Sequence, residues 1–98
     1  MLLETFGPEH VDVEYLLSPG GNPVYSQVIV RSGRTKLFTS YNVRIAFHDG
    51  EGWILDPLAD EHSQTTSRYL NQATGTTKPE RAQLIRDGHF RVEPLNRR

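Results

Sequence analysis

The chain has 98 residues, no cysteine and a net charge of −1, with 36% aliphatic and aromatic residues. This length is enough for one modest hydrophobic core, and the lack of cysteine excludes disulfides and thiolate metal sites. No apolar run approaches the roughly 20 residues of a membrane span, and the N-terminus does not have the pattern of a signal peptide. We therefore expect a single domain over residues 1–98 that is cytoplasmic, does not bind membranes and has flexible ends at residues 1–9 and 94–98.

Charged residues are grouped in bands along the chain. The charged residues are all acids in residues 1–30, all bases in residues 31–48 and all acids in residues 49–61. In residues 62–98 bases outnumber acids. Two explanations are open: oppositely charged neighbouring strands pair across a sheet, or the basic band forms a surface that meets a partner.

The first half of the chain has the patterns of strands. Residues 10–17, HVDVEYLL, alternate apolar and acidic side chains, as in a half-buried strand. A turn-forming run of Ser, Pro, Gly and Asn follows at residues 18–23. Residues 24–31, VYSQVIVR, are rich in β-branched residues. We expect them to form an edge strand that pairs with a second copy or another protein, so that the chain self-associates.

Residues 36–48 show the clearest period of two. Odd positions from Leu37 to Phe47 are predicted to face the core, and even positions, including Phe38, to face solvent. The stretch is either one long strand or two strands broken near Ser40-Tyr41-Asn42. A hairpin at residues 48–52 and a return strand at residues 53–55 follow. Trp53 and Tyr41 are predicted core residues.

After Pro57 the pattern becomes helical. A first helix is predicted to begin with Thr65 or Thr66 as its N-cap, to place Thr66, Leu70 and Ala73 on one face and to end at Gly75. A second helix is predicted to begin at the capping box Thr77-x-x-Glu80, to carry an apolar stripe and to end near Gly88. The residues of that stripe are Ala82, Leu84 and Ile85. A closing strand is expected at residues 89–93. The predicted fold is α+β: an antiparallel β-meander of four to five strands with two short C-terminal helices and a closing strand.

The run Ser63-Gln64-Thr65-Thr66-Ser67-Arg68 contains more hydroxyl groups than one helix cap requires. A helix N-terminus with spare hydroxyls and an arginine can hold a phosphate or another anion. A possible anion site is therefore predicted at Thr65, Thr66, Ser67 and Arg68.

Part of the chain resembles a family of small uncharacterised bacteriophage proteins. The resemblance rests on Ser40-Tyr41-Asn42-Val43-Arg44-Ile45-Ala46, on the run Ser63-x-Thr65-Thr66-Ser67-Arg68 followed by Asn71, and on the closing segment after Gly88. These match the pattern S-Y-x-x-x-I-A, then S-x-T-T-S-[KR]-x-x-N, over residues 36–95. The resemblance implies a phage-encoded accessory protein that acts in the host cytoplasm. It brings no activity and no catalytic residues.

Catalytic and metal sites find little support in the residue patterns. The histidines beside acids, His48 and His62, lack the i, i+4 spacing of a helical metal site, so we expect no metal and no cofactor. Hydroxyl, imidazole and carboxylate side chains occur, but no recognised motif arranges them as a nucleophile and its base. We therefore expect that the protein is not an enzyme.

Binding is the expected function. The predicted binding residues are Arg31, Arg34, Lys36, Phe38 and Arg44, with Lys36, Phe38 and Arg44 on one strand face. An aromatic residue flanked by bases suits docking on a host or phage protein. The alternative is an accessory protein that binds nucleic acid through the same basic strand face. The slightly acidic net charge of the chain disfavours nucleic-acid binding.

Overall fold

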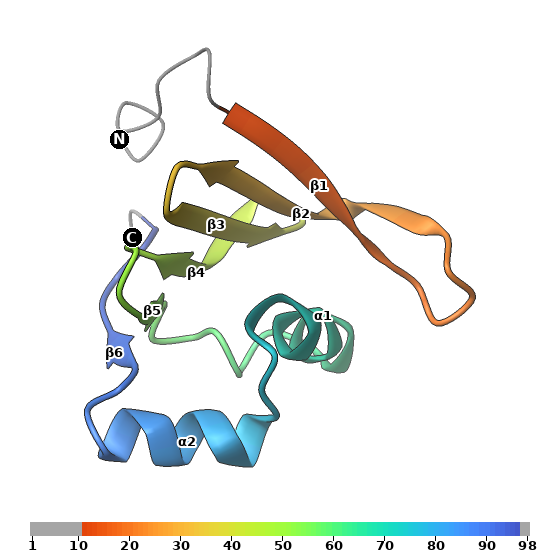
Figure 1. The fold of residues 1–98 in the computed structure, drawn as a ribbon. Coiled ribbons are helices and arrows are strands. Elements are labelled where there is room, and N and C mark those ends of the chain that lie inside the picture. The colour runs from red at the N-terminus through yellow and green to blue at the C-terminus, as the bar shows by residue number, and fades with distance from the viewer. Residues whose placement is uncertain (1–10, 97–98) are drawn as a thin grey trace.

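The computed structural model of the protein describes residues 11–96, and six strands in it form one sheet in chain order (Figure 1). Strands β1 to β5 are antiparallel neighbours, and β6 pairs in parallel with β5. Two helices lie together on one face of the sheet (Figure 1). The predicted α+β fold is confirmed. The elements are β1 Val11–Leu17, β2 Pro23–Ser32, β3 Thr35–Ser40, β4 Val43–His48, β5 Trp53–Leu55, α1 Gln64–Thr74, α2 Lys78–Arg86 and β6 Arg91–Val92.

The expected flexible end at residues 1–9 lies outside the described residues, as do residues 97 and 98. Residues 94–96 follow β6 and make defined contacts. The backbone N–H of Leu95 donates to the Asp56 carboxylate at 2.9 Å, and the Asn96 side chain bonds both backbone groups of Arg44, at 2.7 and 3.0 Å. These bonds tie the end of the described chain to β4 and to the loop after β5.

The long alternating stretch forms two strands, β3 and β4, joined by a tight turn at Tyr41-Asn42. Both turn residues have positive φ, 51° and 66°, as a two-residue hairpin turn requires. The turn points the Tyr41 side chain into solvent, where it is 61% exposed, so the prediction that Tyr41 is a core residue is wrong. The prediction for Trp53 is confirmed, because its side chain is buried.

Phe38 lies at the centre of the core and is 0% exposed, so the prediction that it faces solvent is wrong. It pairs in register with Ile29 of β2 and Ala46 of β4, and this face packs against Leu70 of α1. Leu37, on the opposite face, is buried as well. Because β3 is apolar on both faces at this point, the alternation could not show which face the helices cover.

β2 is an interior strand, flanked by β1 and β3. The prediction of a free edge at residues 24–31 is therefore wrong. The strand predicted at residues 10–17 takes the outer position, as β1, because the loop at residues 18–22 folds it back against β2.

α1 begins two or three residues earlier than predicted, with Ser63 as its N-cap. The Ser63 Oγ accepts the N–H of Thr66 at 3.1 Å, so the prediction of Thr65 or Thr66 at the cap is wrong. Thr66 is buried and its hydroxyl bonds the Ser40 hydroxyl of β3 at 3.0 Å, which joins the helix to the sheet. Leu70 is buried on the same face and Gly75 ends the helix, as predicted.

α2 begins at the predicted capping box, with Thr77 as N-cap and Glu80 at the third helical position. The predicted apolar stripe is wrong: Ala82 and Ile85 are exposed, and the buried residue of this helix is Arg81. α2 packs mainly through polar contacts, because a short helix at the margin of a small sheet has little apolar surface to cover.

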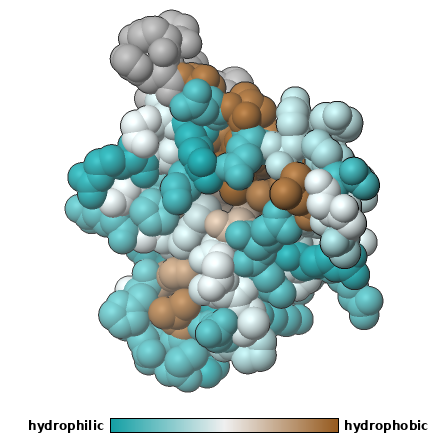
Figure 2. Space-filling model, turned by 45° about the vertical axis from the view of Figure 1, so that its right-hand side comes forward, coloured by the Kyte–Doolittle hydropathy of each residue, from teal (hydrophilic) through white to brown (hydrophobic). Residues whose placement is uncertain are grey.

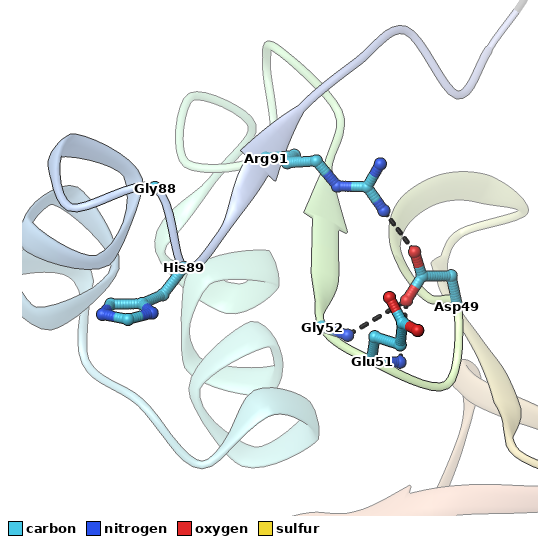
Figure 3. A pocket seen from close by; sticks show the side chains of 6 residues that line it. All are labelled: Asp49, Glu51, Gly52, Gly88, His89 and Arg91. Atoms are coloured by element: carbon cyan, nitrogen blue, oxygen red, sulfur yellow. Dashed lines mark hydrogen bonds and ion pairs between the residues drawn. The ribbon is translucent and has the colours of Figure 1, made fainter.

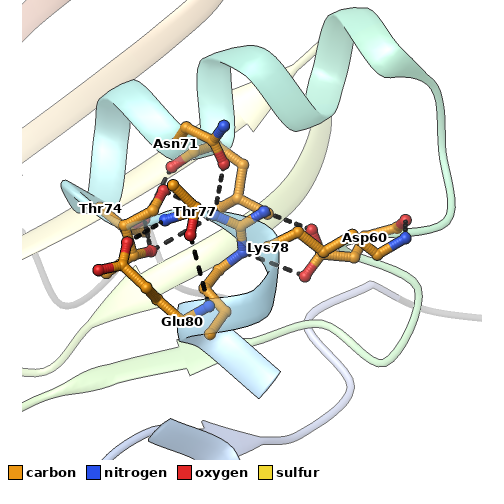
Figure 4. Close-up of polar contacts among 9 residues, drawn as sticks. Asp60, Asn71, Thr74, Thr77, Lys78 and Glu80 are labelled. Atoms are coloured by element: carbon orange, nitrogen blue, oxygen red, sulfur yellow. Dashed lines mark hydrogen bonds and ion pairs between the residues drawn. The ribbon is translucent and has the colours of Figure 1, made fainter. Parts of the chain in front are cut away.

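Arg81 is 0% exposed, and each of its three guanidinium nitrogens donates a hydrogen bond within the chain. Its guanidinium donates twice to the Asp60 carboxylate, at 3.1 and 2.5 Å, and also to the Asn71 side chain at 2.7 Å and the Thr76 carbonyl at 3.0 Å. Figure 4 shows how these contacts bring together the loop at Asp60, the helix α1 at Asn71 and the start of α2. This bonding network holds the two helices together.

β6 is shorter than the strand predicted at residues 89–93 and consists of Arg91–Val92. Phe90 precedes it and packs against the core cluster.

We predict that Arg81→Ala lowers the free energy of unfolding by about 3 kcal/mol, because it leaves the Asp60 carboxylate without its buried partner. Urea unfolding followed by circular dichroism measures the effect. The matched control is Arg86→Ala in the same helix, where the arginine is exposed and bonds only Gln83. The control should lose less than about 1 kcal/mol. Equal losses would show that the buried network does not stabilise the fold.

Candidate functional site

The predicted basic residues do not form one surface. Arg31 forms an ion pair with Glu14 of β1 at 2.7 Å, and the Arg34 side chain donates to the Gly50 carbonyl at 2.7 Å. Lys36 lies beside Arg31 and His48 in register. The charge bands thus meet partly by pairing across neighbouring strands, the first of the two explanations considered above.

Arg44 lies on the opposite face of the sheet from Lys36. The register shifts between Phe38 and Thr39, so Ile45 is an additional residue in β4 and Arg44 pairs with Thr39. Such a bulge reverses the direction of the side chains that precede it. The prediction that Arg44 shares a face with Lys36 and Phe38 is therefore wrong, whereas Lys36 and Phe38 do lie on one face. The Arg44 guanidinium donates to the carbonyl of Leu95 at 3.3 Å.

The hydroxyl run is divided between two surroundings. Thr66 faces the sheet, while Thr65 and Arg68 are exposed and Ser67 is half-buried. Ser67 lines a shallow pocket of about 280 Å³ together with Asp60, Glu61, His62, Ser63, Gln64 and Lys78. Two carboxylates accompany the single lysine, a mixture of charges that does not select an anion. The anion site at Thr65, Thr66, Ser67 and Arg68 stays a prediction.

A second pocket, of about 240 Å³, lies between the β4–β5 turn and the segment that leads into β6 (Figure 3). The Asp49 carboxylate accepts the backbone N–H groups of Glu51 and Gly52, at 2.8 and 3.0 Å, and forms an ion pair with Arg91. These N–H groups, and then the Arg91 charge, hold the pKa of Asp49 below its ordinary value of 3.8. The His89 ring points away from this pair (Figure 3), so the pocket does not bring an imidazole to the carboxylate.

Neither a metal site nor a membrane-spanning helix is found among residues 11–96. No three His, Asp or Glu side chains in this range are grouped so that they could hold a metal ion. Neither α1 nor α2 is long and apolar enough to cross a membrane.

Exposed apolar side chains gather on β1 and β2. They account for five of the nine large hydrophobic residues that are exposed in the described part of the chain: Val11, Val13, Tyr15, Leu17 and Tyr25. Tyr25 is 72% exposed, the highest value of the nine, and its ring meets that of Tyr15 edge to face at 5.0 Å. Figure 2 shows hydrophobic residues at the surface in the upper half of the molecule, where the sheet lies.

The register explains why these side chains lie together. Val13 pairs with Val30 and Tyr15 with Val28, and paired residues of neighbouring strands point to the same face. This face is opposite to the one that carries Ile29, Phe38 and both helices. We call it the β1–β2 outer face, made of Val11, Val13, Tyr15, Val28 and Val30, and of Tyr25, whose ring contacts that of Tyr15. Tyr25 alternates in step with Ile29, but the β1–β2 register shifts between Tyr15 and Leu17, where β2 holds three additional residues. No helix of the described residues covers it (Figure 1).

Strand β1 is also one of the two edges of the sheet, with β2 on one side and no other described strand on the second; the other edge is the two-residue strand β6. Its last residue, Leu17, turns both backbone groups away from β2. The Gln72 side chain of α1 bonds them, accepting the N–H at 3.0 Å and donating to the carbonyl at 3.1 Å. The helix thus closes one end of the edge.

The fold defines a small α+β protein whose six-stranded, mostly antiparallel sheet is covered by helices on one face. Residues 17–88 match the model of a family of unknown function (DUF8033), so the chain belongs to that family. The matched region begins at the last residue of β1 and ends before β6. The comparisons with curated proteins and with solved structures found no match.

Sequence reasoning missed the β1–β2 outer face as a site. The alternation of residues 10–17 assigned the strand but placed its valines and Tyr15 toward a core. The available signal was Tyr25, a candidate aromatic anchor from the sequence, which lies two residues after the turn-forming run at residues 18–23, near the loop end of the β1–β2 hairpin.

We predict that the Asp49 carboxyl titrates below 3.8 in an NMR pH titration of the folded protein. Because the folded pKa is below the unfolded one, the stability that this group contributes is fully present above pH 3.8 and is lost as pH falls through the folded pKa. In Arg91→Gln the pKa should rise only in part, because the N–H groups of Glu51 and Gly52 remain. A return to 3.8 in that variant would show that Arg91, rather than the turn, causes the shift.

Proposed function

We propose that this protein acts by binding another protein, through the β1–β2 outer face, and not by catalysis. The single observation that supports this most is the gathering of Val13, Tyr15 and Tyr25 at the surface of one hairpin, although the same sheet buries a well-packed core on its other face. Contiguous exposed apolar residues on a small domain are typical of interaction surfaces.

Tyrosine strengthens the proposal. Its ring buries a large apolar area with little loss of conformational entropy, and its hydroxyl still finds polar partners. Tyr15 and Tyr25 stand edge to face at 5.0 Å, so each limits the motion of the other before a partner arrives. An anchor that is already ordered costs less entropy on binding.

The arrangement of the basic residues gives little support to nucleic-acid binding. Arg31 is paired with Glu14, Arg34 is bonded to a backbone carbonyl, and Arg44 lies across the sheet from Lys36. The aromatic residue that was to stack on bases, Phe38, is buried. A basic platform with an aromatic at its centre is therefore not formed by these residues.

The biological setting that we propose follows from the resemblance to phage proteins. The protein is a small phage-encoded accessory factor that docks on a host or phage protein in the host cytoplasm and modulates it. Self-association stays a prediction, but not through residues 24–31, because β2 is an interior strand.

The test begins with capture of partners from a lysate of the bacterial host, treated with nuclease, and continues with the purified partner in calorimetry. We predict that Tyr15→Ser combined with Tyr25→Ser weakens binding by at least about tenfold, because aromatic anchors at a buried interface contribute 2 kcal/mol or more.

The control is Tyr41→Asn, which removes another exposed tyrosine and suits the positive φ of that turn. This variant should bind as the wild type does. If Tyr41→Asn weakens binding and the double variant does not, the interface lies at the β3–β4 turn, which meets β2 at Ser26. Recovery of nucleic acid alone would move the function to the basic residues.

A further inference from the structure

We propose that the partner supplies an extended segment that pairs with the free edge of β1, and that this segment alternates apolar and basic residues. The inference rests on the proposed function and specifies the class of partner. The direction of the backbone groups of β1 and the side chains on its two faces support this inference.

The backbone of β1 offers a row of hydrogen-bonding groups on its open side. Leu17 turns its N–H and C=O away from β2, toward Gln72. Alternate residues of a strand direct these groups to the same side, and the additional residues of the register shift between Tyr15 and Leu17 lie in β2. Val11, Val13 and Tyr15 therefore direct their groups to the open side as well.

The hydrogen bonds between β2 and β3 lead to the same direction for the backbone groups of β1. The Tyr41 N–H donates to the Ser26 carbonyl at 2.8 Å, so the even-numbered residues of β2 turn their backbone groups toward β3. The odd-numbered ones, Ile29 and Arg31, then turn theirs toward β1, where they pair with Glu14 and Asp12. This leaves the groups of Val11, Val13 and Tyr15 without a bonded neighbour among residues 11–96.

The side chains beside this edge differ between the two faces. Val11, Val13 and Tyr15 line the outer face, and Asp12 and Glu14 line the other. A strand that pairs here places its alternate side chains next to these two rows. Apolar residues fit against the valines and the tyrosine, and lysine or arginine fits against the two carboxylates.

A second copy of this chain is the other obvious occupant of the edge, and charge disfavours it. β1 has no base, so pairing β1 with β1, parallel or antiparallel, brings Asp12 and Glu14 of one copy beside those of the other. Like charges directly opposite each other destabilise a strand pair. Arg31 is the nearest base, and it already pairs with Glu14 at 2.7 Å. Inward-facing charges of this kind are a common protection of edges against self-pairing.

The loop end of the β1–β2 hairpin limits how far the partner segment can extend in one direction. Gln72 occupies the backbone groups of Leu17, so a partner strand can extend alongside Val11 to Tyr15 and no further in that direction. Recognition thus combines main-chain hydrogen bonds, which are independent of sequence, with side-chain rows that select the partner.

The test uses two synthetic seven-residue peptides, one alternating valine and lysine and one alternating valine and glutamate, titrated into the full chain. We expect the lysine peptide to bind at least about tenfold more tightly, because two opposite-charge pairs replace two like-charge contacts. NMR should show the largest shifts and new exchange protection at the amides of Val11, Val13 and Tyr15.

Two variants sharpen the test. Asp12→Lys combined with Glu14→Lys should reverse the preference between the two peptides. Val13→Pro removes an outward N–H at an edge position, where proline is tolerated, and should weaken binding of the lysine peptide at least about tenfold with the fold intact. If Val13→Pro unfolds, a lysine peptide methylated at alternate backbone nitrogens takes its place and should fail to bind.

Other results would overturn the inference. These are equal binding of both peptides, amide shifts that avoid β1, or a dimer that Val13→Pro dissociates, which would make the second copy the occupant. If a captured partner is lost with the Tyr15 and Tyr25 double variant but kept with Val13→Pro, the proposed function stands and strand pairing is wrong. If both variants keep the partner, the proposed function fails as well.

Discussion

The packing of α1 on one face of the sheet is the constraint on which the rest of the molecule depends. Leu70 and Tyr69 meet Phe38, Ile29 and Ala46, and the Thr66 hydroxyl bonds that of Ser40 at their border. Residues 11–96 form two short helices, and both lie on that face (Figure 1). A sheet has two faces, so the face opposite α1 must be covered by its own side chains, by other parts of the chain or by a partner.

The two halves of the molecule are stabilised by different physics. The sheet and α1 share an apolar core, whereas α2 is attached by the charged network of Arg81 with Asp60 and Asn71. A buried guanidinium requires that every donor find an acceptor, which makes the geometry of the helix pair specific rather than adaptable. β1, at the far edge, has neither kind of support on its outer side, and this sets it apart as the element with capacity left for a partner.

Local patterns predicted much of the fold because they act over a few residues. The turn residues at 18–23, the hairpin at 48–52, the capping box at Thr77 and the end of α1 at Gly75 are found where the sequence indicates. The candidate site was predicted less well. Phe38 was assigned to the surface because β3 is apolar on both faces, and Tyr41 to the core although it lies in the β3–β4 turn. Arg44 was assigned to the face of Lys36 because the additional residue Ile45, which reverses the direction of the side chains before it, leaves no mark in the alternation.

The sequence by itself determined the class of the fold, the order of strands and helices and the separation of charge into bands, since each depends on spacing and composition along the chain. The tertiary structure alone decided which face of each strand is covered, which strand is the edge and which of the arginines are paired. Those outcomes depend on contacts between residues far apart in sequence, such as Leu17 with Gln72 and Asp60 with Arg81. Alternation along a strand is symmetric between its two faces, and only the position of the helices breaks that symmetry.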